Sequence, residues 1–480
     1  MSQESQKYLK GSIVRTLLTT GLAMIPATLA MSLYNIVDTY FVSRLGLEAL
    51  AAMGFCFPIV GVVSCIYHSM STAVMTLLSH ALGRQDDKEA ARILLHGLIF
   101  MFAASLVIGI AGAASCRWLC SFWVETPEVL EYVCQFMTIW LVGNFTISLA
   151  MSTHKFVLAL GFPKKAATWM LASLGLNVIL EPLFIFGPTQ TMAWMNNVLT
   201  SVTAYLTGDV IPPSFVIDPG IGLGMYGAAI ATVIAQALTP VGCLPIIHRR
   251  LKIWTREALD MSKWNEDVLR IVKFSIPTIL GMIIMPLSGF VATGVAAHFG
   301  DKVVAAMACI SRLETLAFVV PMSIGMALMP MFAQNYGAGQ FERIDKIRRI
   351  SQGFAACYLF LCAAVFTILS SVMVGFFTDD AEVLAIGSTG LSIICWGFAG
   401  QEVHRFGCFC YNGCNRPGMS AVFNIIKIFG MMIPLLLLAL VFEDYNWIFW
   451  GRLISELAAA VMVLYLSRRL VRRLIRGEIA

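Results

Sequence analysis

The amino-acid sequence predicts an all-α polytopic membrane protein in which twelve transmembrane helices form two lobes of six. Hydrophobic residues make up 58% of the chain and charged residues only 13%, whereas about a quarter of the residues in a soluble domain are charged. The chain contains about twelve apolar stretches that reach the roughly 20 residues a helix needs to cross a bilayer. The two halves of the chain also resemble each other at a nearly constant offset.

The predicted spans follow one another along the whole chain. Most are longer than a bilayer requires, so tilted or kinked helices are expected, and interior prolines such as Pro26 are candidate kink sites. No cleavage pattern precedes the first span, which is expected to serve as the insertion signal as well. The spans lie near residues 13–42, 49–80, 93–115, 127–160, 165–187, 223–248, 267–298, 303–335, 348–377, 381–412, 418–442 and 445–467.

Lysine and arginine residues indicate the orientation of these helices. With the N-terminus placed inside, the outside loops hold only Arg44, Arg117 and Lys302, and most of the 33 lysine and arginine residues fall in inside segments. The positive-inside rule then predicts a multi-pass protein of the cell inner membrane with both termini in the cytoplasm. The net charge of +5 is explained by this cytoplasmic face, so nucleic acid is not an expected partner.

An internal repeat predicts how the spans are grouped. The triplet Ala51-Ala52-Met53 recurs as Ala305-Ala306-Met307, and Gly83 recurs as Gly337 at the same offset of 254 residues. Because each half has an even number of spans, a pseudo-twofold axis along the membrane normal would relate the halves around a central cavity. We expect an N-lobe over 1–247, a basic cytoplasmic linker over 248–267 and a C-lobe over 268–480. An external insert, 188–222, is expected to form an amphipathic surface helix, either a lid or a passive interfacial element.

Two acidic residues in the N-lobe mark the candidate functional site. Asp38 ends the first span and Glu181 lies inside the fifth; a carboxylate in hydrocarbon is costly and marks a functional site by default. Helical spacing places Tyr34 and Asn35 beside Asp38, and Asn177 beside Glu181. Two nearby carboxyls do not ionise together easily, so the pair could carry a proton or bind a hard cation. The alternatives are an interfacial charge for Asp38 and a structural hydrogen bond for Glu181.

Three segments give the chain a family resemblance: Y-N-x-x-D-x-x-F-V-S-R-L-G at 34–46, G-L-N-x-x-L-E-P at 175–182 and P-M-S-I-G-M-A-L at 321–328. They resemble the multidrug and toxic compound extrusion (MATE) family, and the resemblance covers nearly the whole chain. It implies a V-shaped cavity and a monomeric antiporter that exports amphiphilic, often cationic drugs or toxic metabolites by alternating access. The coupling ion would be H⁺ or Na⁺, and no cofactor is implied. The positions that match the family's N-lobe ion site are Asp38, Asn177, Glu181 and Thr232, with Tyr34, Asn35 and Pro26 in support.

One difference from the family leaves the ion open, since Glu181 stands where many relatives have aspartate. A flippase for lipid-linked precursors remains the alternative function, although it would require a cationic cavity. The C-terminal half carries a second polar set, Arg312, Glu314 and Glu402, which is either an ion or substrate site or a structural ion-pair network. Opposite charges within membranes usually pair, so a cross-helix Arg312–Glu402 pair is plausible.

Enzyme functions are not expected. The chain has no HExxH motif, Walker A motif or nucleophile elbow. The acidic cluster at Asp379, Asp380 and Glu382 needs no role beyond a solvated turn that leads into a helix. No metal site is expected beyond Na⁺ at the N-lobe acids.

Overall fold

The computed structural model describes residues 7–187, 221–255 and 258–479, and every regular element in these ranges is helical. The predicted all-α membrane fold is confirmed. Of the predicted surface insert, only residues 221 and 222 belong to the described part, so its helix or lid lies outside it. The N-terminal bundle consists of α1 (Lys7–Lys10), α2 (Ile13–Ser43), α3 (Leu47–Gly83), α4 (Asp87–Cys120), α5 (Pro127–Val142), α6 (Asn144–Ala159), α7 (Pro163–Ile185) and α9 (Met225–Leu251).

The C-terminal bundle follows the short 3₁₀ helix η1 (Met261–Lys263). Its eleventh span contains a π-helical segment, η2, which carries Lys427 between two α-helical parts. The elements are α10 (Trp264–His298), α11 (Asp301–Gly337), α12 (Phe341–Gly375), α13 (Ala381–Gly413), α14 (Pro417–Ile425), η2 (Ile426–Met432), α15 (Ile433–Phe442) and α16 (Asn446–Ile475).

Twelve spans are present in the described ranges when the bent pair α5 and α6 is taken as one span. The two helices meet at Gly143 with a bend of 53°. A Cβ atom on Gly143 would lie 2.5 Å from the Val233 side chain of α9, so glycine permits this close approach. Pro26, expected as a kink site, lies within one continuous helix, α2.

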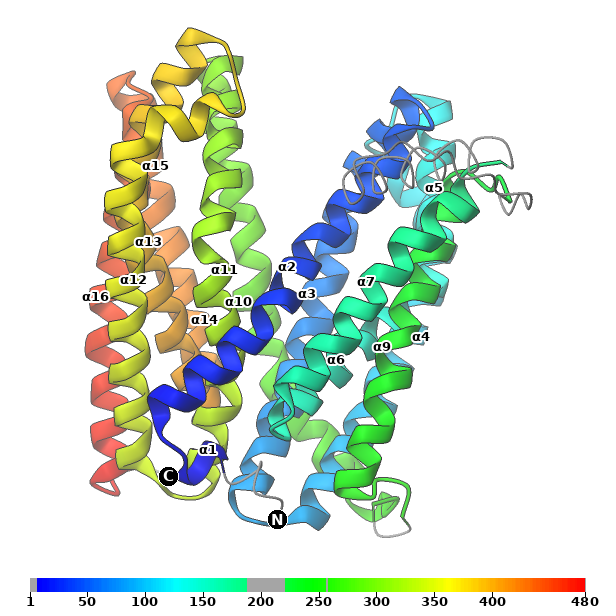
Figure 1. Cartoon of the computed structure of the whole chain (residues 1–480), viewed down its shortest axis with the longest axis vertical. Helices are drawn as coiled ribbons and strands as arrows, with labels where there is room; N and C mark the ends of the chain where they lie inside the picture. The colour runs from blue at the N-terminus through cyan, green and yellow to red at the C-terminus, as the bar shows by residue number, and fades with distance from the viewer. Residues whose placement is uncertain (1–6, 188–220, 256–257, 480) are drawn as a thin grey trace, which may run out of the picture.

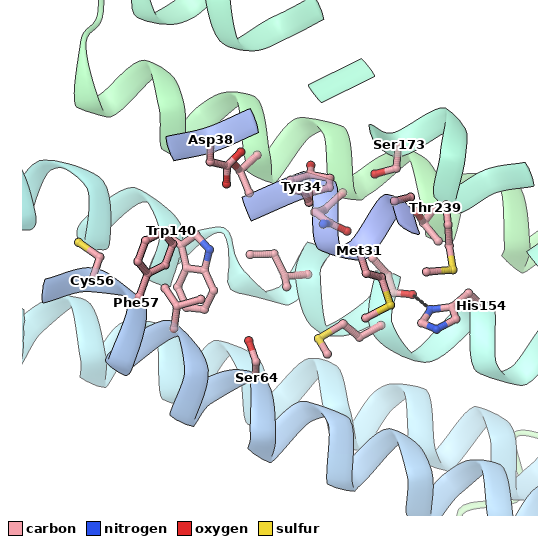
Figure 2. A pocket seen from close by; sticks show the side chains of 18 of the residues that line it. Met31, Tyr34, Asp38, Cys56, Phe57, Ser64, Trp140, His154, Ser173 and Thr239 are labelled. Atoms are coloured by element: carbon pink, nitrogen blue, oxygen red, sulfur yellow. Dashed lines mark hydrogen bonds between the residues drawn. The ribbon is translucent and has the colours of Figure 1, made fainter. Parts of the chain in front are cut away.

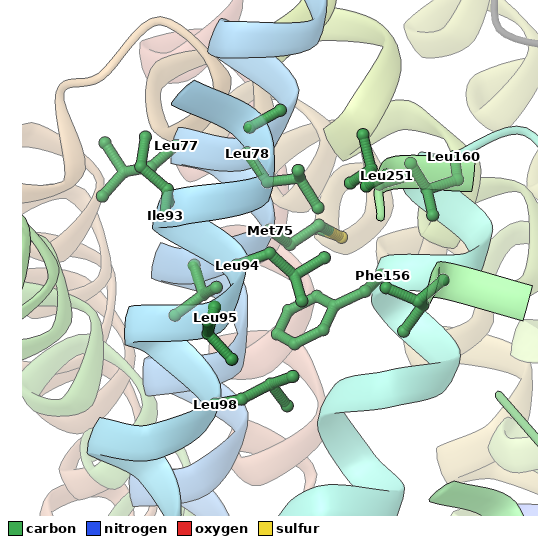
Figure 3. Close-up of a cluster of buried hydrophobic side chains, with 14 of the residues drawn as sticks. Met75, Leu77, Leu78, Ile93, Leu94, Leu95, Leu98, Phe156, Leu160 and Leu251 are labelled. Carbon is green, nitrogen blue, oxygen red and sulfur yellow. The ribbon is translucent and has the colours of Figure 1, made fainter. Parts of the chain in front are cut away.

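The two bundles diverge away from the end at which both chain termini lie (Figure 1). Near the termini they touch through α2 and α3 of one bundle and α10 and α11 of the other. The core of the N-terminal bundle at this end is a cluster of leucines from α3 and α4 packed around Phe156 of α6 (Figure 3).

A crossing of α3 and α11 holds the bundles together near the termini. A Cβ atom on Gly83 would lie 2.1 Å from the carbonyl oxygen of Gln334, and one on Gly337 would lie 2.2 Å from the carbonyl oxygen of His80. Real Cβ atoms do not come this close to a backbone oxygen, so the crossing depends on glycine at both positions. The N-terminal segment adds a further tie, because the hydroxyl of buried Tyr8 donates to Leu158 of α6 at 3.0 Å.

Candidate functional site

The predicted acidic pair comes together inside the N-terminal bundle. Asp38, near the end of α2, and Glu181, on α7, are both buried, and their carboxyl groups lie within hydrogen-bonding reach of each other. The two residues are far apart in sequence and are brought together because α2 packs directly against α7. The carboxyl of Asp38 therefore lies inside the bundle and not on its surface.

Neutral polar groups complete the acidic pair. The amide nitrogen of Asn177 donates to Glu181 Oε1 at 3.2 Å, as the helical spacing predicts. Thr232 of α9 donates its hydroxyl to the Ala228 carbonyl at 3.0 Å, which leaves the hydroxyl oxygen free to accept. Tyr34 lies one helical turn before Asp38. Asn177 and Tyr34 therefore place neutral polar groups beside the pair, and Thr232 lines the same cavity as Asp38.

No lysine or arginine forms an ion pair with Asp38 or Glu181 among the described residues. Two carboxylates at this separation in an apolar interior repel each other strongly unless positive charge reaches them. A shared proton removes one negative charge and supplies the hydrogen for a carboxyl–carboxyl hydrogen bond. Two carboxyls within hydrogen-bonding reach of each other can thus share a proton or bind a cation.

Asp38 opens onto a cavity of about 210 Å³ that lies wholly within the N-terminal bundle. Figure 2 shows Asp38, Tyr34, Met31 and His154 in a row along it. Eight of its twenty lining residues are methionine, phenylalanine, tyrosine or tryptophan, five are serine, threonine or glutamine, and none of the described residues that line it is lysine or arginine. The lining residues are Ala30, Met31, Tyr34, Asp38, Met53, Cys56, Phe57, Val60, Ser64, Phe136, Trp140, Ile147, Ala150, Met151, His154, Met170, Ser173, Thr232, Gln236 and Thr239.

Two of the supporting residues are placed differently from the acids. Pro26 is exposed and does not line the cavity, which separates it from the acidic pair. The side chain of Asn35 lies outside the described part of the structure. Sequence reasoning missed His154, which lines the deep end of the cavity. The signal for it was the polar run Ser152-Thr153-His154-Lys155 inside an apolar span.

Glu314, Glu402 and Glu456, which lie within spans of the C-terminal bundle, are paired with bases, unlike Asp38 and Glu181. Glu314 of α11 pairs with Arg452 of α16, and Lys427 Nζ lies 2.7 Å from Glu456 Oε2. Glu402 Oε1 lies 2.6 Å from Arg405 one helical turn later. The expected Arg312–Glu402 pair does not form, because Arg312 is exposed on α11 and Arg405 already occupies Glu402. These contacts form a charge-balanced network within the bundle.

The acidic cluster of the C-terminal half caps a helix. Asp380 Oδ1 accepts from the backbone N–H groups of Glu382 at 2.9 Å and Val383 at 3.0 Å. These N–H groups and nearby Lys302 hold the pKa of the Asp380 carboxyl below its ordinary value. The cluster is an exposed helix start with a lysine beside it, as the sequence indicated.

Comparison with known proteins identifies a protein family that this chain matches. The MatE family model matches twice, over residues 23–183 and 277–438, and the two matches start 254 residues apart, the offset of the internal repeat. The FAD transporter of Shewanella oneidensis is 26% identical over 465 residues, covering 96% of each chain. The multidrug export protein MepA of Staphylococcus aureus is 22% identical over 477 residues, covering 98% of this chain and 97% of MepA.

Solved structures show the same fold. The Vibrio cholerae MATE transporter VcmN in its bent form superposes with a TM-score of 0.85 at 22% identity, covering 97% of this chain and 98% of VcmN. An outward-facing MATE family transporter of the MOP superfamily superposes with a TM-score of 0.82 at 19% identity, covering 99% of this chain and 100% of the other.

Proposed function

This chain belongs to the MatE family, and we propose that it is a proton-coupled exporter of amphiphilic, often cationic compounds that works by alternating access. It is a transporter rather than an enzyme under this proposal, acts as a monomer and resides in the cell inner membrane. The observation that carries the proposal is the buried contact between Asp38 and Glu181, which has no basic partner among the described residues and opens onto an apolar cavity.

The orientation of the lobes supports export. With the basic segments in the cytoplasm, the α3–α11 crossing closes the cytoplasmic end, and the bundles diverge toward the outside (Figure 1). This arrangement corresponds to an outward-open state, from which a compound is released and a proton is taken up. The pairing of every buried C-lobe acid with a base leaves the N-lobe acids as the groups available for coupling.

Exchange follows from the charge of the acidic pair. A cationic compound is favoured in the cavity when the pair carries negative charge, and protonation of the pair removes that attraction. Coupling requires that the proton affinity differ between the two conformations, because equal affinity shifts no equilibrium. If net charge moves through the membrane field, each elementary charge gains about 2.3 kcal/mol per 100 mV, which corresponds to a more than tenfold bias in accumulation. A one-for-one exchange of a proton for a monovalent cation moves no net charge, so the pH gradient alone drives it.

A proton fits the pair better than Na⁺. The two carboxyls lie within hydrogen-bonding reach of each other, so they can share a single proton. No group of three or more His, Cys, Asp or Glu side chains suited to a metal ion occurs in the described ranges. Asn177 and Thr232 carry further side-chain oxygen atoms, one beside Glu181 and one lining the cavity onto which Asp38 opens, so Na⁺ is the alternative to be tested.

Export of a flavin nucleotide is a second candidate, favoured by similarity to the FAD transporter of Shewanella oneidensis. The lining of the N-lobe cavity favours the first candidate, since it holds an acid and no lysine or arginine, and FAD carries a diphosphate. The same lining also disfavours a flippase, because its lipid-linked substrate carries a negatively charged diphosphate.

Transport in proteoliposomes tests the proposal. Purified protein would be reconstituted and offered a cationic dye or FAD under an imposed proton gradient or an imposed Na⁺ gradient, each applied alone. We expect dye movement driven by the proton gradient only. Dye movement driven by the Na⁺ gradient alone would identify Na⁺, instead of the proton, as the coupling ion. Movement of FAD but not of the dye would establish export of a flavin nucleotide.

A further inference from the structure

The last helix of the chain, α16, ends in a dense row of arginines. Residues 468–476 hold five arginines and no acidic residue, and this part of the helix lies at the end of the molecule where both termini lie (Figure 1). All five side chains are exposed: Arg468, Arg469, Arg472, Arg473 and Arg476.

The arginines occupy one face of the helix. At about 3.6 residues per turn, their five positions fall within an arc of about 140°. The opposite face is buried, because Leu470, Val471 and Leu474 belong to the hydrophobic cluster that also contains Ile344 and Ile347 of α12. The end of α16 is therefore packed firmly against its bundle, with the arginines on the side away from the protein.

The same face continues along α16 as an apolar, exposed surface. Ile454, Val461 and Tyr465 are exposed, and their positions fall in the arc of the arginines. Exposed apolar residues of a span face lipid, and tyrosine is enriched where the hydrocarbon meets the headgroups. α16 has 30 residues and is about 45 Å long, whereas the hydrocarbon layer is about 30 Å thick. The arginines begin one turn after Tyr465, so they lie at headgroup depth and face lipid.

The protein leaves most of this charge without a counter-charge. Glu478 pairs with the last two arginines at 3.3 and 3.5 Å. The first three, Arg468, Arg469 and Arg472, which we call the outward triad, form no ion pair with a carboxylate among the described residues. Asp345 of α12 is already paired with two arginines of its own helix. Like charges one turn apart repel each other, so the outward triad gains from an external anion.

We propose that the outward triad binds the phosphate groups of acidic phospholipids, with phosphatidylglycerol as the simplest case. Guanidinium groups match phosphate oxygens with two parallel hydrogen bonds, and a basic cluster that directly follows a transmembrane helix attracts acidic lipids. The bound phosphates lower the repulsion within the triad. This inference goes beyond the proposed function, since it depends on neither the coupling ion nor the exported compound.

Native mass spectrometry of the purified full chain tests this binding. The protein in detergent would be titrated with phosphatidylglycerol or with phosphatidylcholine of identical acyl chains, and the fraction that carries lipid would be measured. We expect phosphatidylglycerol to bind at least about fivefold more tightly, which is the effect of a single basic residue near an acidic membrane surface. Equal affinity for the two lipids would overturn the proposal.

Variants of the outward triad assign the preference to α16. The triple variant Arg468→Gln, Arg469→Gln and Arg472→Gln should bind the two lipids equally. Because the three side chains are exposed, its unfolding midpoint without added lipid should match that of the unaltered protein. Lysine at the same three positions keeps the charge but not the paired hydrogen bonds, so it should retain a reduced preference.

A matched control removes the same charge elsewhere at the same end of the molecule. Lys164→Gln, Lys165→Gln and Lys263→Gln together replace three exposed lysines that lie outside α16, and this variant should keep the full preference. If the control loses the preference as completely as the triad variant, general positive charge explains the binding and the outward triad is not a site.

A competition experiment separates a lipid site from a site for free phosphate. Glycerol phosphate has the charged headgroup but no acyl chains to lie along the exposed apolar face of α16. At the same concentration as the lipid, it should leave phosphatidylglycerol bound. Displacement of the lipid by an equal concentration of glycerol phosphate would show that the triad binds a soluble phosphate compound, and the lipid assignment would fail.

Discussion

His80 and Gln334 lie at equivalent positions in the two halves, and each donates a hydrogen bond across the lobe interface to the last carbonyl of a helix in the other half. His80 Nε2 lies 2.7 Å from the carbonyl oxygen of Gly413, the end of α13. Gln334 Nε2 lies 2.8 Å from that of Ala159, the end of α6. Donors and acceptors are both related by the offset of 254 residues.

The two glycines at the crossing of α3 and α11 are related by the same offset of 254 residues. Gly83 packs against Gln334, and Gly337 packs against His80, so each half supplies one glycine and one hydrogen-bond donor. The contact is isologous in the sense used for symmetric dimers. Final helical carbonyls have no partner within their own helix, so these bonds cap two helices while joining the lobes at the end that we propose faces the cytoplasm. Opening that end must break both bonds together.

Enlarging either glycine should open the cytoplasmic end. Gly83→Ala and Gly337→Ala would each place a methyl group against a backbone oxygen of the facing helix, and backbone gives way less easily than a side chain. Cys414, which is buried beside Gly413, would be the reporter in a background without other cysteines. We expect several-fold faster labelling of Cys414 by a membrane-impermeant maleimide from the cytoplasmic side.

The control for this prediction lies on the same helix. Gly54 and Gly61 of α3 have open space where a Cβ would stand, so Gly54→Ala and Gly61→Ala should leave labelling unchanged. Equal labelling rates in all four variants would show that the crossing does not hold the end closed.

The two hydrogen bonds between the lobes should tolerate exchange of their donor residues, but the protein should be destabilised when a donor is removed. His80→Leu and Gln334→Leu leave a buried carbonyl unpaired, which costs about 1–3 kcal/mol each. His80→Gln and Gln334→His each place at one site the residue that works at the other. Thermal unfolding in detergent should therefore show a lower midpoint for the leucine variants than for the exchanged ones. A leucine variant as stable as the unaltered protein would contradict the assigned bonds.

Two buried lysines should respond oppositely to the same substitution. Lys427 is paired with Glu456, so Lys427→Met leaves a buried carboxylate unpaired, at a cost of about 3–5 kcal/mol. Lys155 is also buried, but its Nζ contacts only neutral atoms of His68 and Thr72, at 3.1 to 3.4 Å. Lys155→Met removes an uncompensated charge and should leave stability unchanged or raise it. Equal destabilisation of the two variants in a thermal unfolding assay would contradict this difference.

Much of the fold follows from the sequence because bilayer-spanning helices obey a length and polarity rule that each segment satisfies alone. The internal repeat could be detected in the sequence for a similar reason, because the close crossing of α3 and α11 requires glycine at both Gly83 and Gly337. Asp38 and Glu181 stood out because a carboxylate within an apolar span is rare. The contact between them needed the structure, because it depends on how α2 packs on α7.

Other features depend on packing that a single sequence does not display. The bend at Gly143 lies where Val233 of another helix approaches closely, a contact that the sequence alone does not display. Arg312 was expected to pair with Glu402, but the direction in which a helix faces cannot be read from charge alone. His154 passed unnoticed because a histidine in a span is informative only when its neighbours are known.

The acidic pair should behave as one coupling unit. Asp38→Asn and Glu181→Gln keep the shape of each side chain but cannot exchange a proton, and in either variant the remaining carboxyl has no second carboxyl with which to share one. We expect each single variant to lose proton-driven export by at least about tenfold, and the double variant to be no worse than the more defective single one. Residues that act through one interaction show this lack of additivity, whereas independent sites multiply their defects.

Measurement of proton-driven dye efflux in proteoliposomes, with protein amount equalised, separates these cases. Glu314→Gln is a matched control, since Glu314 pairs with Arg452 in the C-terminal bundle and is not expected to carry the coupling proton. It should lower stability while leaving the ratio of protons to dye unchanged. If the N-lobe defects multiply, or if Glu314→Gln changes that ratio, coupling does not reside in the contact between Asp38 and Glu181. The charge-balanced C-lobe network would then have to release a proton from an ion pair, which requires its arginine to move away during the transport cycle.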